Sequence, residues 1–224
     1  MEIRFLNWRL SVERVFFDEN TLAGMYDDAA SRWSRSIDRM GYVDAYRQLF
    51  ERLCADDTLA ALPDVPAVLD GGIGTGELAA GLMSVKPRAH WHGVDISDAM
   101  LAAAQHNLGV TGDFRQANLA DLPYDANTFD VVISAHALEH MPQPQPGFSE
   151  LLRVLKPGQP FVIVATRLCP ITTALSLRWN FKPMPTDFVR ETLMQAGAAH
   201  VNVQSLMPPY NMSHMSLVYS GIKA

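Results

Sequence analysis

Short apolar segments alternate with amphipathic segments through the middle of the chain. The apolar segments have the length of buried strands. They lie at residues 67–70, 91–94, 129–134 and 160–165. Segments with helical spacing lie between them, at about 76–85, 98–107 and 147–155. Strands that alternate with helices predict a doubly wound α/β fold, with a mostly parallel sheet and helices on both of its faces.

The end of the chain contains two further strand-like segments. A helix is expected from residue 184 to about 196, and strands are expected over Ala198–Leu206 and Ser216–Ile222. Pro208-Pro209-Tyr210-Asn211 lies between these strands. Because proline and asparagine favour turns, we expect this segment to form a hairpin connection.

The first part of the chain has a helical pattern instead. Helical spacing is clearest where it places five residues on one face: Tyr42, Tyr46, Leu49, Phe50 and Leu53. Pro63 and Pro66 then favour extended backbone. We therefore expect an N-terminal helical cap over residues 1–62 and a core over residues 63–224.

One connection within this core is long and apolar. Residues 167–184 carry six large apolar side chains, namely Leu168, Ile171, Leu175, Leu177, Trp179 and Phe181. Long loops over the active edge of a sheet often act as lids, so this segment is a candidate lid insertion that selects the substrate. An ordinary packed helix is the alternative.

Composition and charge narrow the function classes. The 224 residues carry a net charge of −6, and no basic stripe is present to bind a nucleic-acid backbone. Cys54 and Cys169 lie far apart and have no metal-ligand spacing, which favours reduced thiols in a cytoplasmic protein. No segment is apolar enough for a membrane span, and the N-terminus lacks the apolar block of a signal peptide.

A glycine-rich turn follows the first predicted strand of the core. After Val68-Leu69 the chain reads Asp70-Gly71-Gly72-Ile73-Gly74-Thr75-Gly76. Glycine lets the backbone turn sharply and approach a ligand closely, and a helix that starts here would direct its free N–H groups at that ligand. The dinucleotide pattern G-x-G-x-x-G is broken, because counting from Gly72 its third glycine would fall on Glu77.

A second acid ends the next predicted strand. Asp95 lies 25 residues after Asp70, and Ser97 or Asp98 would cap the helix that follows. An acid at this place in a doubly wound sheet commonly binds the hydroxyl groups of a ribose. A carboxylate suits a diol because it accepts two hydrogen bonds.

Four segments in order resemble the motifs of the class I S-adenosylmethionine-dependent methyltransferases. Residues 70–76 match D-x-G-x-G-x-G, and the strand ending at Asp95 matches the second motif. Gln116–Tyr124 is similar to D-A-x-x-L-P-F, except that Asn118 stands where the family usually has Asp. Thr128–Ser134 is similar to S-F-D-x-V, and Ala135–His140 to x-x-L-E-H. The resemblance covers about residues 64–166 and implies a seven-stranded sheet that ends in a C-terminal antiparallel hairpin.

The resemblance also implies S-adenosyl-L-methionine as cofactor and S-adenosyl-L-homocysteine as product. It assigns the amino-acid part of the cofactor to Asp70, Gly71, Gly72, Gly74 and Gly76. It assigns the ribose to Asp95, the adenine to Ile96, Asn118 and Leu119, and the surroundings of the sulfonium to Ser134, Ala135 and His136. Met100 is expected in the same cofactor site. Tyr26 belongs to a segment similar to Y-D-x-x-A-x-x-W, which implies an aromatic ring closing over the methionine end.

His136 and His140 are the candidate catalytic residues. Imidazole titrates near neutral pH, and a general base is needed when the methyl acceptor carries a proton. Local packing is the alternative role for both. With Glu139 they also have the i, i+3, i+4 spacing of a metal site. Metal-binding relatives begin that pattern with Glu instead of His, so we expect no metal.

The sequence therefore predicts an enzyme that transfers a methyl group directly, in line, to a small apolar or amphipathic acceptor. One alternative is a membrane-associated phospholipid or quinone methyltransferase, because the first 20 residues are rich in apolar side chains. The other is a catalytically silent module that binds S-adenosylmethionine. We expect no nucleic-acid partner, and the apolar N-terminal arm could form a homodimer contact.

Overall fold

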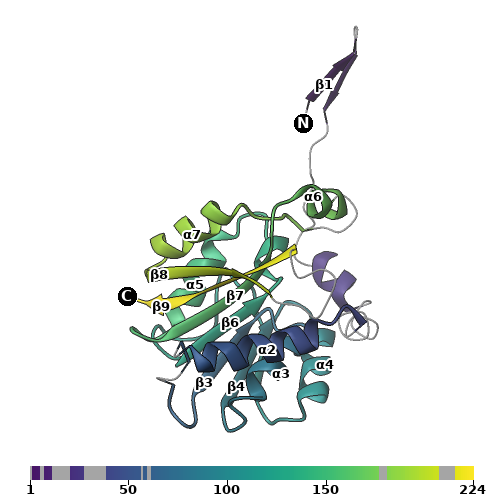
Figure 1. Ribbon diagram of the computed structural model, residues 1–224. Coiled ribbons are helices and arrows are strands. Elements are labelled where there is room, and N and C mark those ends of the chain that lie inside the picture. The colour runs from purple at the N-terminus through teal and green to yellow at the C-terminus, as the bar shows by residue number, and fades with distance from the viewer. Residues whose placement is uncertain are drawn as a thin grey trace.

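The structure is organised around one large sheet (Figure 1). This computed structural model describes residues 2–5, 8–11, 21–27, 39–56, 58–59, 62–176, 181–206 and 215–224. The sheet has seven strands in the order β5-β4-β3-β6-β7-β9-β8. Their bounds are β3 Ala67–Gly71, β4 His90–Asp95, β5 Asp113–Gln116, β6 Val131–Ala135, β7 Pro160–Thr166, β8 Ala198–Ser205 and β9 Ser216–Lys223.

Strand directions confirm the predicted mostly parallel sheet. Strands β3 to β7 all pair in parallel, whereas β9 is antiparallel to both β7 and β8. The C-terminal hairpin therefore contributes one reversed strand, β9, which lies between β7 and β8. Strand β5 was not predicted. It is an edge strand with Phe114 as its single large apolar residue, so its sequence lacks the apolar run of a central strand.

Helices cover both faces of the sheet, as predicted. Their bounds are α2 Tyr42–Ala55, α3 Glu77–Met83, α4 Asp98–Leu108, η1 Leu138–His140, α5 Gln145–Val154, α6 Pro170–Ser176 and α7 Thr186–Gln195. Residues 21–27 are also helical. In Figure 1, α2, α3 and α4 lie on one side of the sheet, and α5 and α7 lie on the other.

Two separate cores result from this arrangement, because successive strand residues point to opposite faces. In β6, Val131 and Ile133 pack in the core beneath α2, α3 and α4. Val132 lies between them in sequence and packs with α5 and α7 on the other face. Central strands of this kind are buried on both sides, which explains their continuous apolar sequences.

Helix α2 confirms the helical face predicted from the N-terminal sequence. Tyr42, Tyr46, Leu49, Phe50 and Leu53 are all buried. The helix packs against α3, and the approach is close because α3 offers Gly81. A Cβ atom at Gly81 would lie 2.8 Å from the Cβ of Tyr46.

The helical prediction is wrong for the first residues of the chain. Strands β1 Glu2–Phe5 and β2 Trp8–Ser11 form an antiparallel hairpin that is separate from the large sheet. Alternation such as Glu2-Ile3-Arg4-Phe5 has the period of two that suits a strand. Within the described residues, no helix has both the length and the apolar character needed to cross a membrane.

The candidate lid contains helix α6 and two exposed apolar side chains. Leu168 is 47% exposed and Ile171 is 55% exposed. Leu177 and Trp179 lie outside the described residues, as does the connection at 208–211. Whether residues 167–184 act as a lid stays a prediction.

One carboxylate links three segments at the amino ends of the strands, opposite the ends that carry the motif residues. Asp130 Oδ2 accepts a hydrogen bond from the N–H of Ala67 at 2.9 Å, and Oδ1 accepts one from Lys156 Nζ at 2.7 Å. We expect Asp130→Ala to lower the free energy of unfolding by about 1–3 kcal/mol, because it leaves both donors without this acceptor. Urea unfolding monitored by circular dichroism measures the change.

Asp64→Ala is the matched control for this experiment. Asp64 pairs with Arg88 at 3.3 Å, but its side chain is 89% exposed. Exposed ion pairs contribute less than about 1 kcal/mol. An equal loss of stability in both variants would contradict the role given to Asp130.

Candidate functional site

The motif residues gather where the strand order reverses. Strand β3 pairs with β4 on one side and with β6 on the other. Strand β5 then follows β4 on the first side of the sheet, and β7 follows β6 on the second. Open α/β sheets bind ligands beyond the carboxyl ends of the strands at such a point. The carboxyl ends of β3, β4, β5 and β6 and the segments that follow them carry Asp70–Gly76, Asp95–Ser97, Asn118–Leu119 and His136.

The glycine-rich turn is bound to the end of β4. The backbone N–H groups of Gly72 and Ile73 both donate to the carbonyl of Val94, at 2.8 and 2.9 Å. Gly72, Gly74 and Gly76 have positive φ angles of 71°, 53° and 93°. These angles are strained for residues with a Cβ, so the conformation of the turn depends on glycine.

The space available for a side chain differs between Gly72 and Gly74. A Cβ atom at Gly72 would lie 2.3 Å from the Cβ of Ala137, so the backbone at Gly72 lies directly against the segment after β6. A Cβ atom at Gly74 would have no neighbour within 4 Å among the residues that the structure describes. The turn is therefore packed on its inner side and open at Gly74, where a ligand can approach the backbone.

Asp95 connects the turn to the helix after β4. Its Oδ2 accepts from the N–H of Gly74 at 2.9 Å, and its Oδ1 accepts from the N–H of Ser97 at 3.0 Å. Burial raises the pKa of Asp95, and the backbone donors of Ser97 and Gly74 lower it in part. Each carboxylate oxygen has a second lone pair, so the group can also accept hydrogen bonds from two hydroxyl groups of a ligand.

Asp70 is buried at the end of β3. The residue is 1% exposed, and neither of its carboxylate oxygens has a hydrogen-bond partner in the described part of the chain. Burial raises its pKa well above the usual range, and the charges of Asp95 and Glu77 add to this effect. A buried carboxyl without a partner favours a cationic or hydrogen-bonding ligand group nearby. The ammonium group of the expected cofactor fits that requirement.

Other residues predicted to bind the cofactor make hydrogen bonds within the protein. Ser134 Oγ donates to the carbonyl of Gly71 at 2.7 Å, which joins β6 to the end of β3. Asn118 Oδ1 accepts from the N–H of Ala120 at 2.8 Å and so shapes its own turn. Met100 is buried, and its N–H donates to Ser97 Oγ at 3.1 Å.

Three further residues predicted to bind the cofactor are Ile96, Leu119 and Ala135. The backbone carbonyl of Ile96 accepts from Gln116 Nε2 at 2.9 Å. Leu119 is buried and packs close to Gly71, where an added Cβ would lie 3.1 Å from its side chain. Ala135 ends β6 and packs against the core beneath α2. Their contacts with a cofactor stay a prediction.

The N-terminal helical residues 21–27 reach both sides of the site. The hydroxyl of Tyr26 lies 3.0 Å from His140 Nε2, after β6. The next residue, Asp27, accepts hydrogen bonds from Ser97 Oγ at 2.5 Å and from the N–H of Ala99 at 3.3 Å. Burial raises the pKa of Tyr26, and the charges of Asp95 and Glu139 raise it further.

His136 lies in a polar cluster at the carboxyl end of β6. Its Nδ1 is 3.1 Å from Glu139 Oε1 and 3.2 Å from Thr166 Oγ1, and its Nε2 is 3.4 Å from Ser216 Oγ. His136 has a positive φ of 54°, which is uncommon outside glycine. The ring of Tyr42 packs edge-on against the imidazole, with centroids 5.4 Å apart.

Glu139 is the buried acid of this cluster. It is 3% exposed and accepts hydrogen bonds from the N–H and the Oγ1 of Thr166, at 2.9 and 2.5 Å. Burial by itself raises the pKa of Glu139, but the nearby His136 and His140 and the Thr166 hydroxyl outweigh it, so the pKa lies below its usual value. Glu139 is therefore ionised at neutral pH.

Sequence reasoning missed several members of this site. Asp27 is the second residue of the Y-D-x-x-A-x-x-W segment, which gave it no role, and the sequence pointed to no place for Thr166, Ser216 or Tyr42 in this cluster. The last three come from β7, β9 and α2, so no local pattern links them to His136. Among the described residues, no group of three His, Cys, Asp or Glu side chains is arranged to hold a metal ion.

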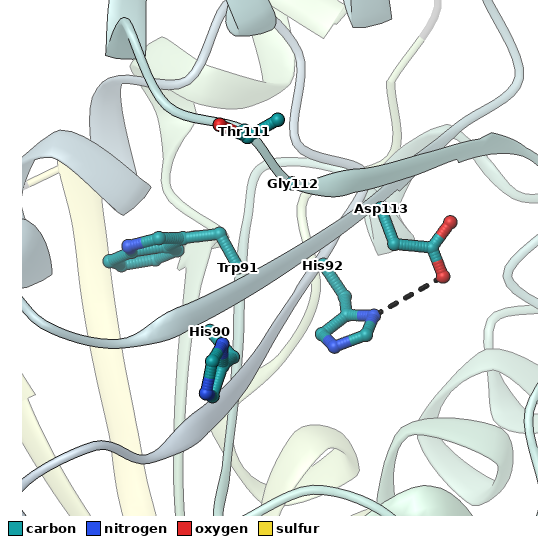
Figure 2. A pocket seen from close by; sticks show the side chains of 6 residues that line it. All are labelled: His90, Trp91, His92, Thr111, Gly112 and Asp113. Atoms are coloured by element: carbon teal, nitrogen blue, oxygen red, sulfur yellow. Dashed lines mark ion pairs between the residues drawn. The ribbon is translucent and has the colours of Figure 1, made fainter.

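A shallow hollow also lies at the opposite edge of the sheet (Figure 2). It is lined by the first residues of β4 and β5 and by the loop before β5. Figure 2 shows His92 pointing to Asp113, 3.4 Å away, while Trp91 extends to the other side of the strand. Burial lowers the pKa of His92, which makes its imidazole neutral at pH 7. None of the residues predicted to bind the cofactor or to act in catalysis lines this hollow.

Replacement of Gly72 tests the packing of the turn. We expect Gly72→Ala to cost about 1–2 kcal/mol for its positive φ and a further ~1–3 kcal/mol for the collision with Ala137. Gly109→Ala is the matched control, because Gly109 also has a positive φ of 62° but open space around its Cβ position. Thermal and urea unfolding of both variants measure the difference, and equal losses would contradict the close packing at Gly72.

The buried Asp70 predicts a pH dependence of stability. An acid whose pKa is raised in the folded state binds more protons there than in the unfolded chain. The free energy of unfolding should therefore fall as pH rises from about 4 through the raised pKa. In Asp70→Asn this fall should be smaller. Urea unfolding at about pH 5 and about pH 8 compares it with the exposed control Asp98→Asn, and an unchanged slope in Asp70→Asn would refute this assignment.

Comparison with known proteins yields both sequence and structural relatives. Residues 69–163 match the family model described as methyltransferase domain. A demethylmenaquinone methyltransferase from Clavibacter sepedonicus is 31% identical over 156 residues, which cover 67% of this chain and 60% of that protein. A ubiquinone biosynthesis O-methyltransferase from Hahella chejuensis is 35% identical over 137 residues, which cover 59% of this chain and 56% of that protein. The chain thus spans less than two thirds of the length of these relatives.

The fold has a close structural counterpart. Magnesium protoporphyrin IX methyltransferase from Synechocystis PCC 6803, crystallised with bound S-adenosylhomocysteine, superposes with a TM-score of 0.71 at 20% sequence identity. The match covers 92% of this chain and 100% of that chain. Together with the sheet order and the motif residues at its switch point, these matches show that the chain belongs to the class I S-adenosylmethionine-dependent methyltransferases.

Proposed function

We propose that the protein transfers the methyl group of S-adenosyl-L-methionine to a small apolar or amphipathic acceptor and releases S-adenosyl-L-homocysteine. The observation that carries this proposal is the geometry of Asp95. Its carboxylate holds the glycine-rich turn and the start of α4 together, and its remaining lone pairs suit a ribose diol. When bound, the cofactor supplies a methyl group on a sulfonium, which is a good leaving group.

The surrounding residues fit the same cofactor. The open backbone at Gly74 allows close approach, and the unpartnered carboxyl of Asp70 suits an ammonium group. The hydroxyl and ring of Tyr26 contact His140, which places the ring beside the reacting end of the site. We assign the cofactor contacts to these residues and to Gly71, Gly72, Gly76, Ile96, Met100, Asn118, Leu119, Ser134 and Ala135. Direct transfer then requires alignment more than covalent chemistry by the protein.

The named relatives favour a quinone-type acceptor. Both curated relatives described above carry names from quinone biosynthesis, and quinone rings with apolar tails are amphipathic. Aromatic side chains near the reacting end, Tyr26, Tyr42 and Phe181, suit a planar ring. A phospholipid acceptor and a silent cofactor-binding module remain the alternatives, and turnover of a quinol separates them from our proposal.

The partners and the location form part of this proposal. We propose a cytoplasmic enzyme with a small-molecule partner and no nucleic-acid partner, since the net charge is −6 and both cysteines are free thiols. The exposed Leu168 and Ile171 of the candidate lid are apolar enough for contact with a lipid-like acceptor or a second subunit. Sedimentation with and without lipid vesicles distinguishes these two contacts.

Calorimetric titration with S-adenosylhomocysteine tests the cofactor site. Asp95→Ala should weaken binding at least tenfold, because a carboxylate acceptor of ligand hydroxyl groups contributes about 1.5–3 kcal/mol. Asp98→Ala removes an exposed acid three residues away and should leave the affinity unchanged. If wild-type protein prefers NADH, or if both variants bind equally well, the proposed function is wrong.

A further inference from the structure

Glu139 restricts the protonation of the His136 ring. The ionised carboxylate only accepts hydrogen bonds, and its Oε1 lies 3.1 Å from His136 Nδ1. The Thr166 hydroxyl donates to the same carboxylate, so its oxygen is also left to accept from Nδ1. Both neighbours of Nδ1 are therefore acceptors, and the neutral imidazole carries its proton on Nδ1.

The other ring nitrogen is then the basic atom. With the proton on Nδ1, the lone pair of the imidazole lies on Nε2. Within the described part of the chain, its one hydrogen-bond neighbour is Ser216 Oγ at 3.4 Å, which is long for a hydrogen bond. Ser216 is also bonded to the hydroxyl of Tyr42, at 3.2 Å. An incoming hydroxyl group can replace the weak Ser216 contact without breaking a strong one.

The position of His136 suits proton removal from an acceptor. It directly follows β6 at the carboxyl ends of the strands, and its backbone N–H donates a hydrogen bond to the carbonyl of Val164 at 2.9 Å. Its side chain keeps 20% of its surface exposed, whereas Glu139 behind it keeps 3%. The buried acid thus supports the ring from the interior while the ring retains access to the site.

We propose that Glu139 is a positioning residue that fixes His136 as a general base with Nε2 as the reactive atom, and that the acceptor is a ring hydroxyl of phenolic acidity. This proposal rests on the proposed methyl transfer. A phenol has a pKa near 10, within reach of an imidazole during transfer, whereas an aliphatic alcohol is far less acidic. The edge-on ring of Tyr42 beside His136 suits a flat aromatic acceptor.

The proposed transfer moves one proton and one methyl group. The hydroxyl proton of the acceptor passes to His136 Nε2, and the oxygen lone pair forms the new O–C bond to the methyl group. The methyl–sulfur bond breaks, and its electron pair stays on sulfur. The products are the methyl ether, S-adenosylhomocysteine and a histidinium that returns its proton to water. Glu139 stabilises that histidinium through its negative charge. Tyr42 is the other titratable group that faces the His136 ring. His140 is the second histidine beside Glu139.

Nitrogen-15 NMR of the histidine rings tests the positioning role without any acceptor. In the wild-type protein above pH 7 we expect His136 as the Nδ1-protonated tautomer. In Glu139→Gln we expect a mixture of tautomers, because a glutamine side chain can donate to Nδ1 as well as accept from it. A wild-type ring protonated on Nε2 overturns the proposal, and so does an unchanged tautomer in Glu139→Gln. The wild-type measurement decides the case even if the variant does not fold.

Methyl transfer to 1,4-naphthohydroquinone under anaerobic, reducing conditions tests the acceptor class. We expect an O-methyl ether as product, and a rate at least 100-fold lower in His136→Gln with S-adenosylhomocysteine affinity retained. His106→Gln, at an exposed position of α4, is the matched control and should keep full activity.

The outcomes separate the two proposals. Methylation of a ring carbon, or no transfer by a protein that binds S-adenosylhomocysteine normally, overturns the hydroxyl acceptor. Normal transfer by His136→Gln overturns the base. Failure of the wild-type protein to bind S-adenosylhomocysteine would instead overturn the proposed function itself.

Discussion

The binding of the glycine-rich turn to the end of β4 is the constraint on which the site depends. The Val94 carbonyl and the Asp95 carboxylate together receive four backbone N–H groups, from Gly72, Ile73, Gly74 and Ser97. These bonds fix the turn after β3 relative to the helix after β4. The collision that any side chain at Gly72 would have with Ala137 fixes the same turn relative to β6. Three strand ends are thereby held in one arrangement, and ligand contacts can be divided among them.

Two buried acids, Asp70 and Glu139, and the partly buried Asp95 have different environments. Glu139 receives donors from Thr166 and is flanked by two histidines, so it stays ionised and supports a base. Asp95 is satisfied by backbone N–H groups and keeps spare lone pairs for a diol. Neither carboxylate oxygen of Asp70 has a hydrogen-bond partner of good geometry among the described residues, and burial raises its pKa well above the usual range, so a ligand group can supply the missing donor. The charge of Asp95 adds to the raised pKa of Asp70. Acids in such different environments favour a binding site over a purely structural cluster.

The N-terminal helical segment connects the two halves of the site. Asp27 binds the start of α4, on the side expected to hold the nucleoside, while Tyr26 binds His140, on the side expected to hold the reacting methyl group. Adjacent residues of one short segment thus reach groups that follow different strands. These two contacts fix the segment relative to α4 and η1.

The sequence by itself determined the order of strands and helices, the turn at Asp70–Gly76 and the acids at the strand ends. These features are local, because periodicity, glycine and capping act over a few residues. Strand β5 and the hairpin of β1 and β2 escaped prediction, since short strands are defined by pairing as much as by sequence. The cluster around His136 was decided by the tertiary structure alone. Its members Tyr42 and Ser216 are 174 residues apart, and only the packing of α2 and β9 against the end of β6 brings them together.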